Sequence, residues 1–190
     1  MIDQYQAATA GLADAVERRV LEIWAAFEDG SIDHDTAVAL IASVLNRANA
    51  TAVSLADAGV AAQIEAAIGT PTSVAGVAPV DDSGRLINAV TTVLAAAKDE
   101  RLVRLSRLAR SEPLNTAQQA GVDAMQAQPL VEGWVRQLDG DPCQLCRWWS
   151  RDGRVWPKNH PFQRHPGCNC QPRVVLVQHV KSTVKTRSNR

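Results

Sequence analysis

The sequence predicts a mainly α-helical protein with a small C-terminal α+β module. Hydrophobic residues make up 46% of the 190 positions, yet only 4% are aromatic, because alanine is abundant. Alanine has the highest helix propensity. All four cysteines fall within residues 143–170, and β-branched segments flank this stretch on both sides. We therefore expect a long helical hairpin body, plus a knob (residues 139–170) cross-linked by Cys and His between two short strands.

Residues 1–68 predict the helical hairpin. Apolar residues recur at three- and four-residue spacing from Ile2 to Phe27, and Asp29-Gly30 is typical of a helix end. Asp33 is a suitable N-cap for a second helix. The apolar stripe of that helix continues past Gly59 to Ile68.

Residues 69–84 predict a hinge loop, because Gly, Pro, Ser and Thr are concentrated there. Residues 85–128 predict a further helical segment. Its apolar spacing suggests one helix from about Arg85 to Arg110, and Pro113 suits the first turn of another that ends near Ala127.

Residues 129–178 predict a strand–knob–strand module. Residues 131–138 and 173–178 have strand character, and Asp139-Gly-Asp-Pro142 predicts a tight turn before Cys143. Residues 179–190 are polar and basic, as in a flexible tail.

The knob carries the candidate metal ligands, Cys143, Cys146, His165, Cys168 and Cys170. Cys-x2-Cys is a common chelating spacing, and zinc takes four nitrogen or sulfur ligands in a tetrahedron. We expect a structural zinc ion held by Cys143, Cys146 and Cys168, with either His165 or Cys170 as the fourth ligand. Disulfides are the alternative cross-link, and they would require an oxidising setting.

Tryptophans surround the cysteines. A module this small needs apolar cover around its cross-link, so we expect these side chains to form the core of the knob. Base stacking is the functional alternative. The four residues are Trp134, Trp148, Trp149 and Trp156.

The net charge of zero conceals an asymmetry. Residues 153–190 contain eight basic residues and no acidic one, whereas residues 1–152 contain 12 basic and 20 acidic residues. A basic C-terminal end suits nucleic acid or an acidic protein surface. The candidate contacts are Arg101, Arg104, Arg107, Lys181, Lys185, Arg187 and Arg190. For the three helical arginines, a solvated face with local ion pairs is the alternative.

Neither a membrane nor an enzymatic role is favoured by the sequence. No apolar run reaches the ~18 residues of a membrane span, and the N-terminus lacks the features of a signal peptide. No Glu follows Glu132 to move protons at a catalytic zinc. Ser150 with His160 or His165 could form a protease pair, but no Gly-x-Ser-x-Gly motif surrounds the serine.

The order of short motifs resembles a known family. Gly133-Trp-x-Arg136, Asp139-Gly-Asp-Pro-Cys143-x2-Cys146, Asp152-Gly-Arg-Val155 and His165-Pro-x-Cys168-x-Cys170 follow one another and lead into an apolar strand. This combination resembles the C-terminal part of the phage Mu F-like minor head proteins, in the form found in phages of actinobacteria. The resemblance covers about residues 110–178, and the alanine-rich N-terminal half is similar only in general character.

The resemblance implies a structural head-morphogenesis protein of a tailed phage. It would be made in the host cytoplasm and would lie in the virion, at the portal vertex or the inner capsid wall. Its partners would be the portal protein, the major capsid protein and packaged DNA. Proteins of this appearance are also labelled capsid maturation proteases, which is the first alternative, and a nucleic-acid-binding zinc module is the second.

Overall fold

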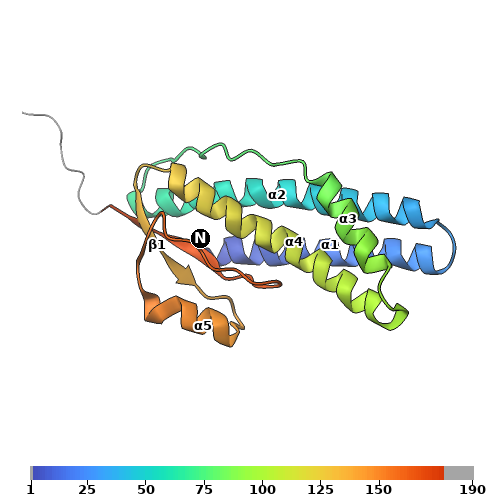
Figure 1. Cartoon of the computed structure of the whole chain (residues 1–190). Coiled ribbons are helices and arrows are strands. Elements are labelled where there is room, and N and C mark those ends of the chain that lie inside the picture. The colour runs from blue at the N-terminus through green and yellow to red at the C-terminus, as the bar shows by residue number, and fades with distance from the viewer. Residues whose placement is uncertain (1, 178–190) are drawn as a thin grey trace, which may run out of the picture.

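The computed structural model describes residues 2–177 and confirms the predicted fold class. The elements are α1 (Ile2–Glu28), α2 (His34–Ile68), α3 (Ser83–Leu94), α4 (Lys98–Ala127), β1 (Val131–Gln137), α5 (Gln144–Ser150), the 3-10 turn η1 (Arg151–Gly153), β2 (Trp156–Pro157) and β3 (Gln171–Leu176). The long helices lie side by side, and the strands and α5 gather at one end of them (Figure 1). The predicted tail, with Lys181, Lys185, Arg187 and Arg190, lies outside the described residues.

The hairpin of α1 and α2 forms as predicted, and its caps explain where it turns. The carboxylate of Asp33 accepts a hydrogen bond from the backbone N–H of Thr36 (2.7 Å), which makes Asp33 the N-cap of α2. The helix ends at Gly69, whose left-handed backbone (φ 71°) suits a residue without a Cβ. Gly59 lies inside α2 against the ring of Tyr5, where a Cβ would be only 2.9 Å from Tyr5 Cδ2, so α1 and α2 approach closely there.

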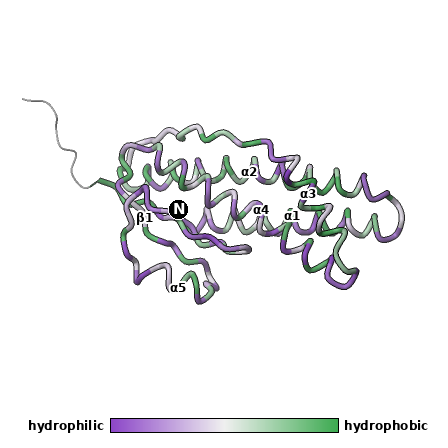
Figure 2. Tube along the Cα trace, in the orientation of Figure 1, coloured by the Kyte–Doolittle hydropathy of each residue, from purple (hydrophilic) through white to green (hydrophobic). Residues whose placement is uncertain are grey.

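Hydrophobic residues are spread along all the long helices (Figure 2). At the end remote from the sheet, α1, α2, α3 and α4 share a core that contains Val20, Ile41, Leu45 and Leu105. At the other end, α2 and α4 pack against the sheet. Helix α2 is long and apolar enough to span a membrane by length and composition. The core helix of a soluble protein meets the same criterion, and α2 lies in contact with α1, α3 and α4.

The boundary between α3 and α4 differs from the prediction. The chain turns at Ala95–Ala97, and α4 then runs unbroken from Lys98 through Pro113 to Ala127. The expected helix over 85–110 and the expected helix start at Pro113 are therefore wrong. A proline inside a helix removes one backbone hydrogen bond. Helix α4 tolerates this because it packs on both α1 and α2 along its length.

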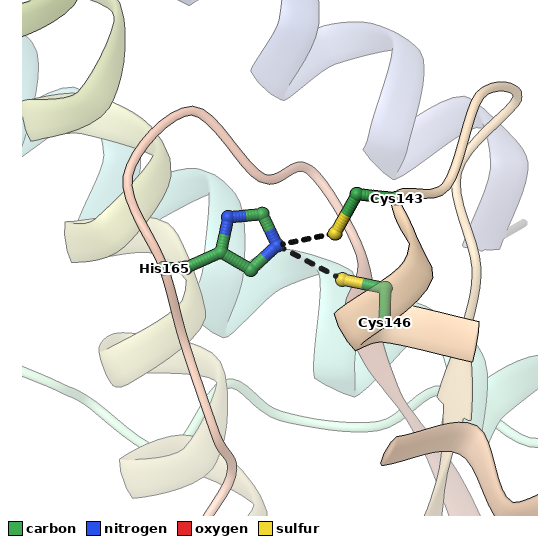
Figure 3. Close-up of side chains that lie close together, drawn as sticks. All are labelled: Cys143, Cys146 and His165. Atoms are coloured by element: carbon green, nitrogen blue, oxygen red, sulfur yellow. Dashed lines mark hydrogen bonds between the residues drawn. The ribbon is translucent and has the colours of Figure 1, made fainter. Parts of the chain in front are cut away.

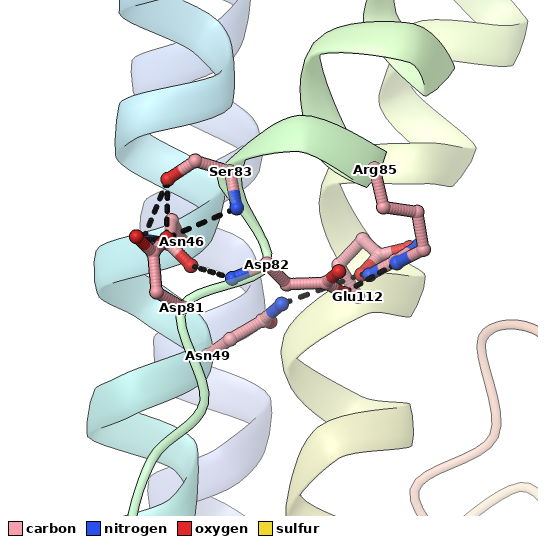
Figure 4. A network of polar contacts seen from close by, with 7 residues as sticks. All are labelled: Asn46, Asn49, Asp81, Asp82, Ser83, Arg85 and Glu112. Carbon is pink, nitrogen blue, oxygen red and sulfur yellow. Dashed lines mark hydrogen bonds and ion pairs between the residues drawn. The ribbon is translucent and has the colours of Figure 1, made fainter.

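A polar network fixes the start of α3 against α2 and α4 (Figure 4). Asn46 of α2 donates to Asp81 (2.9 Å) and accepts from the N–H of Asp82 (3.1 Å). Arg85 donates to Glu112 of α4 through Nη2 (2.6 Å), and Glu112 retains only 13% of its side-chain exposure. These contacts determine where the chain re-enters helical structure.

The segment predicted as a hinge is non-helical from 69 to 82 and runs back along α2 (Figure 1). Its middle is held by the buried carboxylate of Asp57. That carboxylate accepts hydrogen bonds from three successive backbone N–H groups, those of Ala75 (2.7 Å), Gly76 (2.7 Å) and Val77 (2.9 Å). The loop is thus fastened to the helix that it crosses.

The two predicted strands pair antiparallel as the central and one outer strand of a sheet with the order β2-β1-β3. The short strand β2 was not predicted; it pairs antiparallel to β1, with Trp156 opposite Trp134. Gly133 is required there, because a Cβ at this position would lie 2.2 Å from the carbonyl oxygen of Trp156. The sheet holds both ends of the knob, since β1 leads into it and β3 follows it.

Candidate metal centre

Helix α5 positions the first pair of cysteines. Cys143 occupies its N-cap position, and Cys146 lies three residues later on the same face. Cys143 is exposed, whereas Cys146 is 1% exposed. The Cys-x2-Cys spacing therefore presents one sulfur at the surface and one in the interior, both directed toward His165 (Figure 3).

A tight turn positions the remaining ligands. The backbone N–H of Cys168 donates to the carbonyl of His165 (3.3 Å), with Pro166 and Gly167 between them. Gly167 has φ 77°, so the turn has the Pro–Gly pattern of type II. Cys168 and Cys170 then point the same way, because alternate residues of an extended chain share a face. Both cysteines are buried.

The five predicted ligands come together in two groups that share Cys146. In one group, His165 Nε2 lies 3.1 Å from the sulfurs of both Cys143 and Cys146 (Figure 3). In the other, Cys146 Sγ lies 3.3 Å from Cys168 Sγ, and Cys170 Sγ is adjacent. A zinc tetrahedron has edges of about 3.5–3.8 Å for sulfur and nitrogen ligands. Either group could hold a metal ion after shifts of a few tenths of an ångström at these contacts. A single ion shared by Cys143, Cys146, His165 and Cys168 would also require the two groups to move closer together.

The cysteines are not joined as disulfides. All four are free, and the 3.3 Å between Cys146 Sγ and Cys168 Sγ is well beyond the ~2.05 Å of a disulfide bond. The four sulfurs are separate, unjoined atoms in two ligand groups that share Cys146.

The cysteine sulfurs differ in their affinity for a proton. A hydrogen bond from Cys170 lowers the pKa of Cys168 to about 5, so Cys168 is the readiest thiolate. Burial raises the pKa of Cys146 to about 12. The hydrogen bond to Cys168, together with burial, also raises the pKa of Cys170. A bound cation would favour loss of the proton from the thiols that ligate it.

Backbone contacts hold the imidazole of His165 in place. Its Nδ1 lies 3.2 Å from the carbonyl oxygen of Pro166. Because a carbonyl only accepts, Nδ1 carries the proton, and the lone pair is on Nε2, the atom that faces the sulfurs. Metal-ligating histidines are commonly oriented by such a second hydrogen bond.

The cluster is attached to the helical body by residues that sequence reasoning missed. Gln118 of α4 is fully buried and donates to the carbonyl oxygens of Cys168 (2.8 Å) and Cys170 (2.9 Å). Asn169 accepts from the hydroxyl of Thr9 (2.7 Å) and donates to the carbonyl of Gln6 (2.8 Å), both in α1. In the sequence, these residues could have been recognised as polar side chains at helix positions expected to be buried. The knob is therefore fixed to both the first and the fourth helix.

The tryptophans only partly match the prediction of a knob core. Trp134 is 2% exposed, and its ring centroid lies 5.0 Å from that of Phe162. Trp149 and Trp156 are half-buried, and Trp156 stacks on His160 at 4.0 Å. Trp148 is 60% exposed, so its assignment to the core is wrong. It lies on α5 two residues after Cys146, which turns it away from the buried face.

The arginine row of α4 does not form one basic face. Arg101 donates to the carbonyl of Ala96 (2.8 Å), and Arg104 pairs with Glu100 (2.5 Å). Arg107 is exposed. Residues three apart are offset by about 60° around a helix with 3.6 residues per turn. The row consequently winds around α4 instead of presenting a single stripe.

The geometry around Ser150 does not resemble a catalytic pair. The Ser150 hydroxyl donates to the carbonyl of Arg147 in its own helix (2.7 Å). His165 faces sulfur atoms, and His160 stacks on Trp156. Within residues 2–177, neither histidine ring is hydrogen-bonded to Ser150.

No family model, curated protein or solved structure matches the chain.

Proposed function

We propose that this chain is a structural minor head protein of a tailed phage, with a zinc ion as the internal cross-link of its knob. The order of the motifs from Gly133 to Cys170 supports the family assignment. The observation that carries the structural role is the position of the cluster. Its ligands join α5 to the loop before β3, and that loop is bonded to α1 and α4. A cross-link there stabilises the whole chain.

The proposed zinc ligands are Cys143, Cys146, Cys168 and His165. His165 is preferred to Cys170 because its Nε2 is aimed between two of the sulfurs and its ring is oriented by a carbonyl. Cys170 would then remain a thiol that donates to the thiolate of Cys168. Zinc bound in this way supplies folding free energy, because the site does not exist in the unfolded chain.

A structural site fits better than a catalytic one. Four protein ligands leave no open position for water or substrate. Cys146 and Cys168 are buried, and no carboxylate belongs to either ligand group among the described residues. The protease alternative has no specific observation in its favour, because Ser150 is hydrogen-bonded within α5.

Zinc analysis tests the cross-link directly. We expect protein purified without added chelator to contain one zinc per chain by elemental analysis. His165→Ala should lose the metal and Cys170→Ser should keep it. A metal-free wild-type protein would contradict the zinc site, whereas loss of zinc from Cys170→Ser but not from His165→Ala would reverse the choice of fourth ligand.

Assembly in the phage tests the biological role. We expect the protein to be present in purified heads and to co-purify with the portal or major capsid protein when they are expressed together. A phage lacking the protein should make defective heads, and the wild-type gene should restore them. Ser150→Ala should restore them equally, because the protein is proposed not to be a protease. Normal heads without the protein would refute the proposal, and failure of Ser150→Ala alone, with the capsid protein uncleaved, would support the protease alternative.

The basic C-terminal end, residues 153–190, is proposed to face packaged DNA or an acidic protein surface. Phosphate contacts are independent of sequence and weaken steeply with salt. We expect the purified protein to bind random-sequence duplex DNA at low salt and to release it as salt increases. Absence of binding at low salt would remove DNA from the proposed partners while leaving the portal and capsid contacts in place.

A further inference from the structure

Arg136 of β1 is a buried cation without a carboxylate partner. Its side chain lies in the interior, and the residue is 4% exposed. None of the ion pairs between described residues includes it. Its Nη2 donates to the carbonyl oxygen of Gln163, and its Nε has no acceptor. A buried guanidinium normally requires a compensating negative charge.

The group that can provide this charge is the sulfur cluster. Arg136 Nη1 lies 4.0 Å from Cys146 Sγ, which is one of the proposed zinc ligands. The other neighbours of the guanidinium are aromatic: its carbon lies 3.9 Å from the centroid of Phe162 and 5.3 Å from that of Trp149. Aromatic rings attract a cation but do not neutralise it.

We infer that Arg136 is the counter-cation of the metal–thiolate centre, an inference that rests on the proposed zinc site. A zinc ion with three thiolates and one neutral imidazole has a net charge of −1, which one guanidinium balances. Four thiolates would leave the buried assembly with a net charge of −1 even with Arg136. Charge balance therefore agrees with the choice of His165 over Cys170. Arg136 acts on the metal through its ligands and is a positioning residue.

The inference predicts that the positive charge of Arg136 strengthens metal binding, and that bound metal stabilises this buried charge. Without metal, fewer of the neighbouring sulfurs are thiolates, so the guanidinium is less fully compensated than in the metal-bound form. Replacement by an apolar side chain of similar length should weaken the metal-bound form selectively. A purely structural role, through contacts with Phe162 and Trp149, would weaken the metal-free and metal-bound forms alike.

Zinc affinity measured by competition with a chromophoric chelator tests this inference. For Arg136→Met we expect zinc to bind about 10- to 100-fold more weakly than to the wild type, as is usual for second-sphere partners. Arg136→Lys keeps the charge and should lose less. Arg154→Met is the matched control, because Arg154 also lies over a tryptophan ring, that of Trp156 (4.3 Å), and has no contact with the sulfurs. Its zinc affinity should not change.

Urea unfolding of metal-free proteins provides the second measurement. Arg136→Met should lose less stability in the metal-free form than in the zinc-bound form, each compared with the wild type in the same form. Equal zinc affinity in wild type and Arg136→Met, or equal destabilisation with and without zinc, would overturn the inference while leaving the zinc site standing. A wild-type protein that binds no zinc would overturn both. If Arg136→Met does not fold, Arg136→Lys provides the test, because lysine keeps the positive charge. If Arg136→Lys bound zinc as weakly as a variant that lacks one zinc ligand, a role based on charge would be excluded.

Discussion

Removal of the Asp57 carboxylate should release the loop over residues 69–82 from α2. Asp57 is 4% exposed, and it accepts the N–H groups of Ala75, Gly76 and Val77 at 2.7–2.9 Å. The three donors are consecutive, so a single side chain fixes the conformation of the middle of the loop. Asp57→Ala removes all three hydrogen bonds, and Asp57→Asn keeps an oxygen that can serve only some of them.

The expected loss follows from the exposure of the donors. Hydrogen bonds to a charged acceptor contribute roughly 1.5–3 kcal/mol each when the partners stay buried. Gly76 is exposed, and Ala75 and Val77 are half-buried, so water can replace much of the carboxylate. The contribution of each hydrogen bond is therefore near the lower end of this range, and hydrogen bonds to water recover part of it. We expect Asp57→Ala to lower the free energy of unfolding by about 2–4 kcal/mol and Asp57→Asn by about half as much.

Urea denaturation followed by tryptophan fluorescence measures the stability change, and hydrogen exchange at residues 75–77 locates it. Exchange there should accelerate in both variants while the amides within α2 stay protected. Glu65→Gln is the matched control, because Glu65 is an exposed acid of the same helix. If Asp57→Ala came within ~0.5 kcal/mol of the wild type, with unchanged exchange at these amides, the carboxylate would not be what fastens the loop.

Four further variants test other parts of the structure. Gly133→Ala should cost about 1–3 kcal/mol, because its Cβ would displace the Trp156 carbonyl and separate β2 from β1; unchanged thermal stability would contradict that contact. Hydrogen bonds from a serine and then an arginine of α4 lower the pKa of Glu17, so its stabilisation is present above the unfolded pKa of ~4.3 and disappears as pH falls through the folded value. Glu17→Gln should accordingly flatten the acid limb of the stability–pH curve by up to ~1 kcal/mol, and a limb identical to that of the wild type would refute this. Trp134→Ala should cost about 3–5 kcal/mol and Trp148→Ala less than ~0.5 kcal/mol; similar melting temperatures for the two would refute the difference in burial.

The hairpin was predictable because its signals are local. Spacing of apolar residues, the N-cap at Asp33 and the glycine after Ile68 each act within a few residues. The break between α3 and α4 was not predictable from the sequence, because Ala95–Ala97 favours a helix in isolation and Pro113 disfavours one. Packing of both helices on α2 outweighs these preferences.

The candidate site was predictable in composition and not in its surroundings. The spacing identified the five candidate ligands, since chelation requires these residue types close together. The exposure of Trp148 depends on the helical geometry of α5, which the sequence around Cys146 did not reveal. Strand β2 has only two residues, too few for any periodic signal. The contacts of Gln6 and Gln118 join segments far apart in the sequence, and no local pattern reports such pairing.

The bonds between Asn169 and α1 have a consequence for the timing of synthesis. Thr9 and Asn169 are separated by 160 positions, so the ribosome must translate nearly the whole chain before they can meet. Helices α1 and α2 can pair much earlier, as neighbours in a hairpin. The hairpin can therefore form on the nascent chain while the surface around Gln6 is still uncovered. Completion of the fold waits for the segment from His165 to Cys170 to emerge.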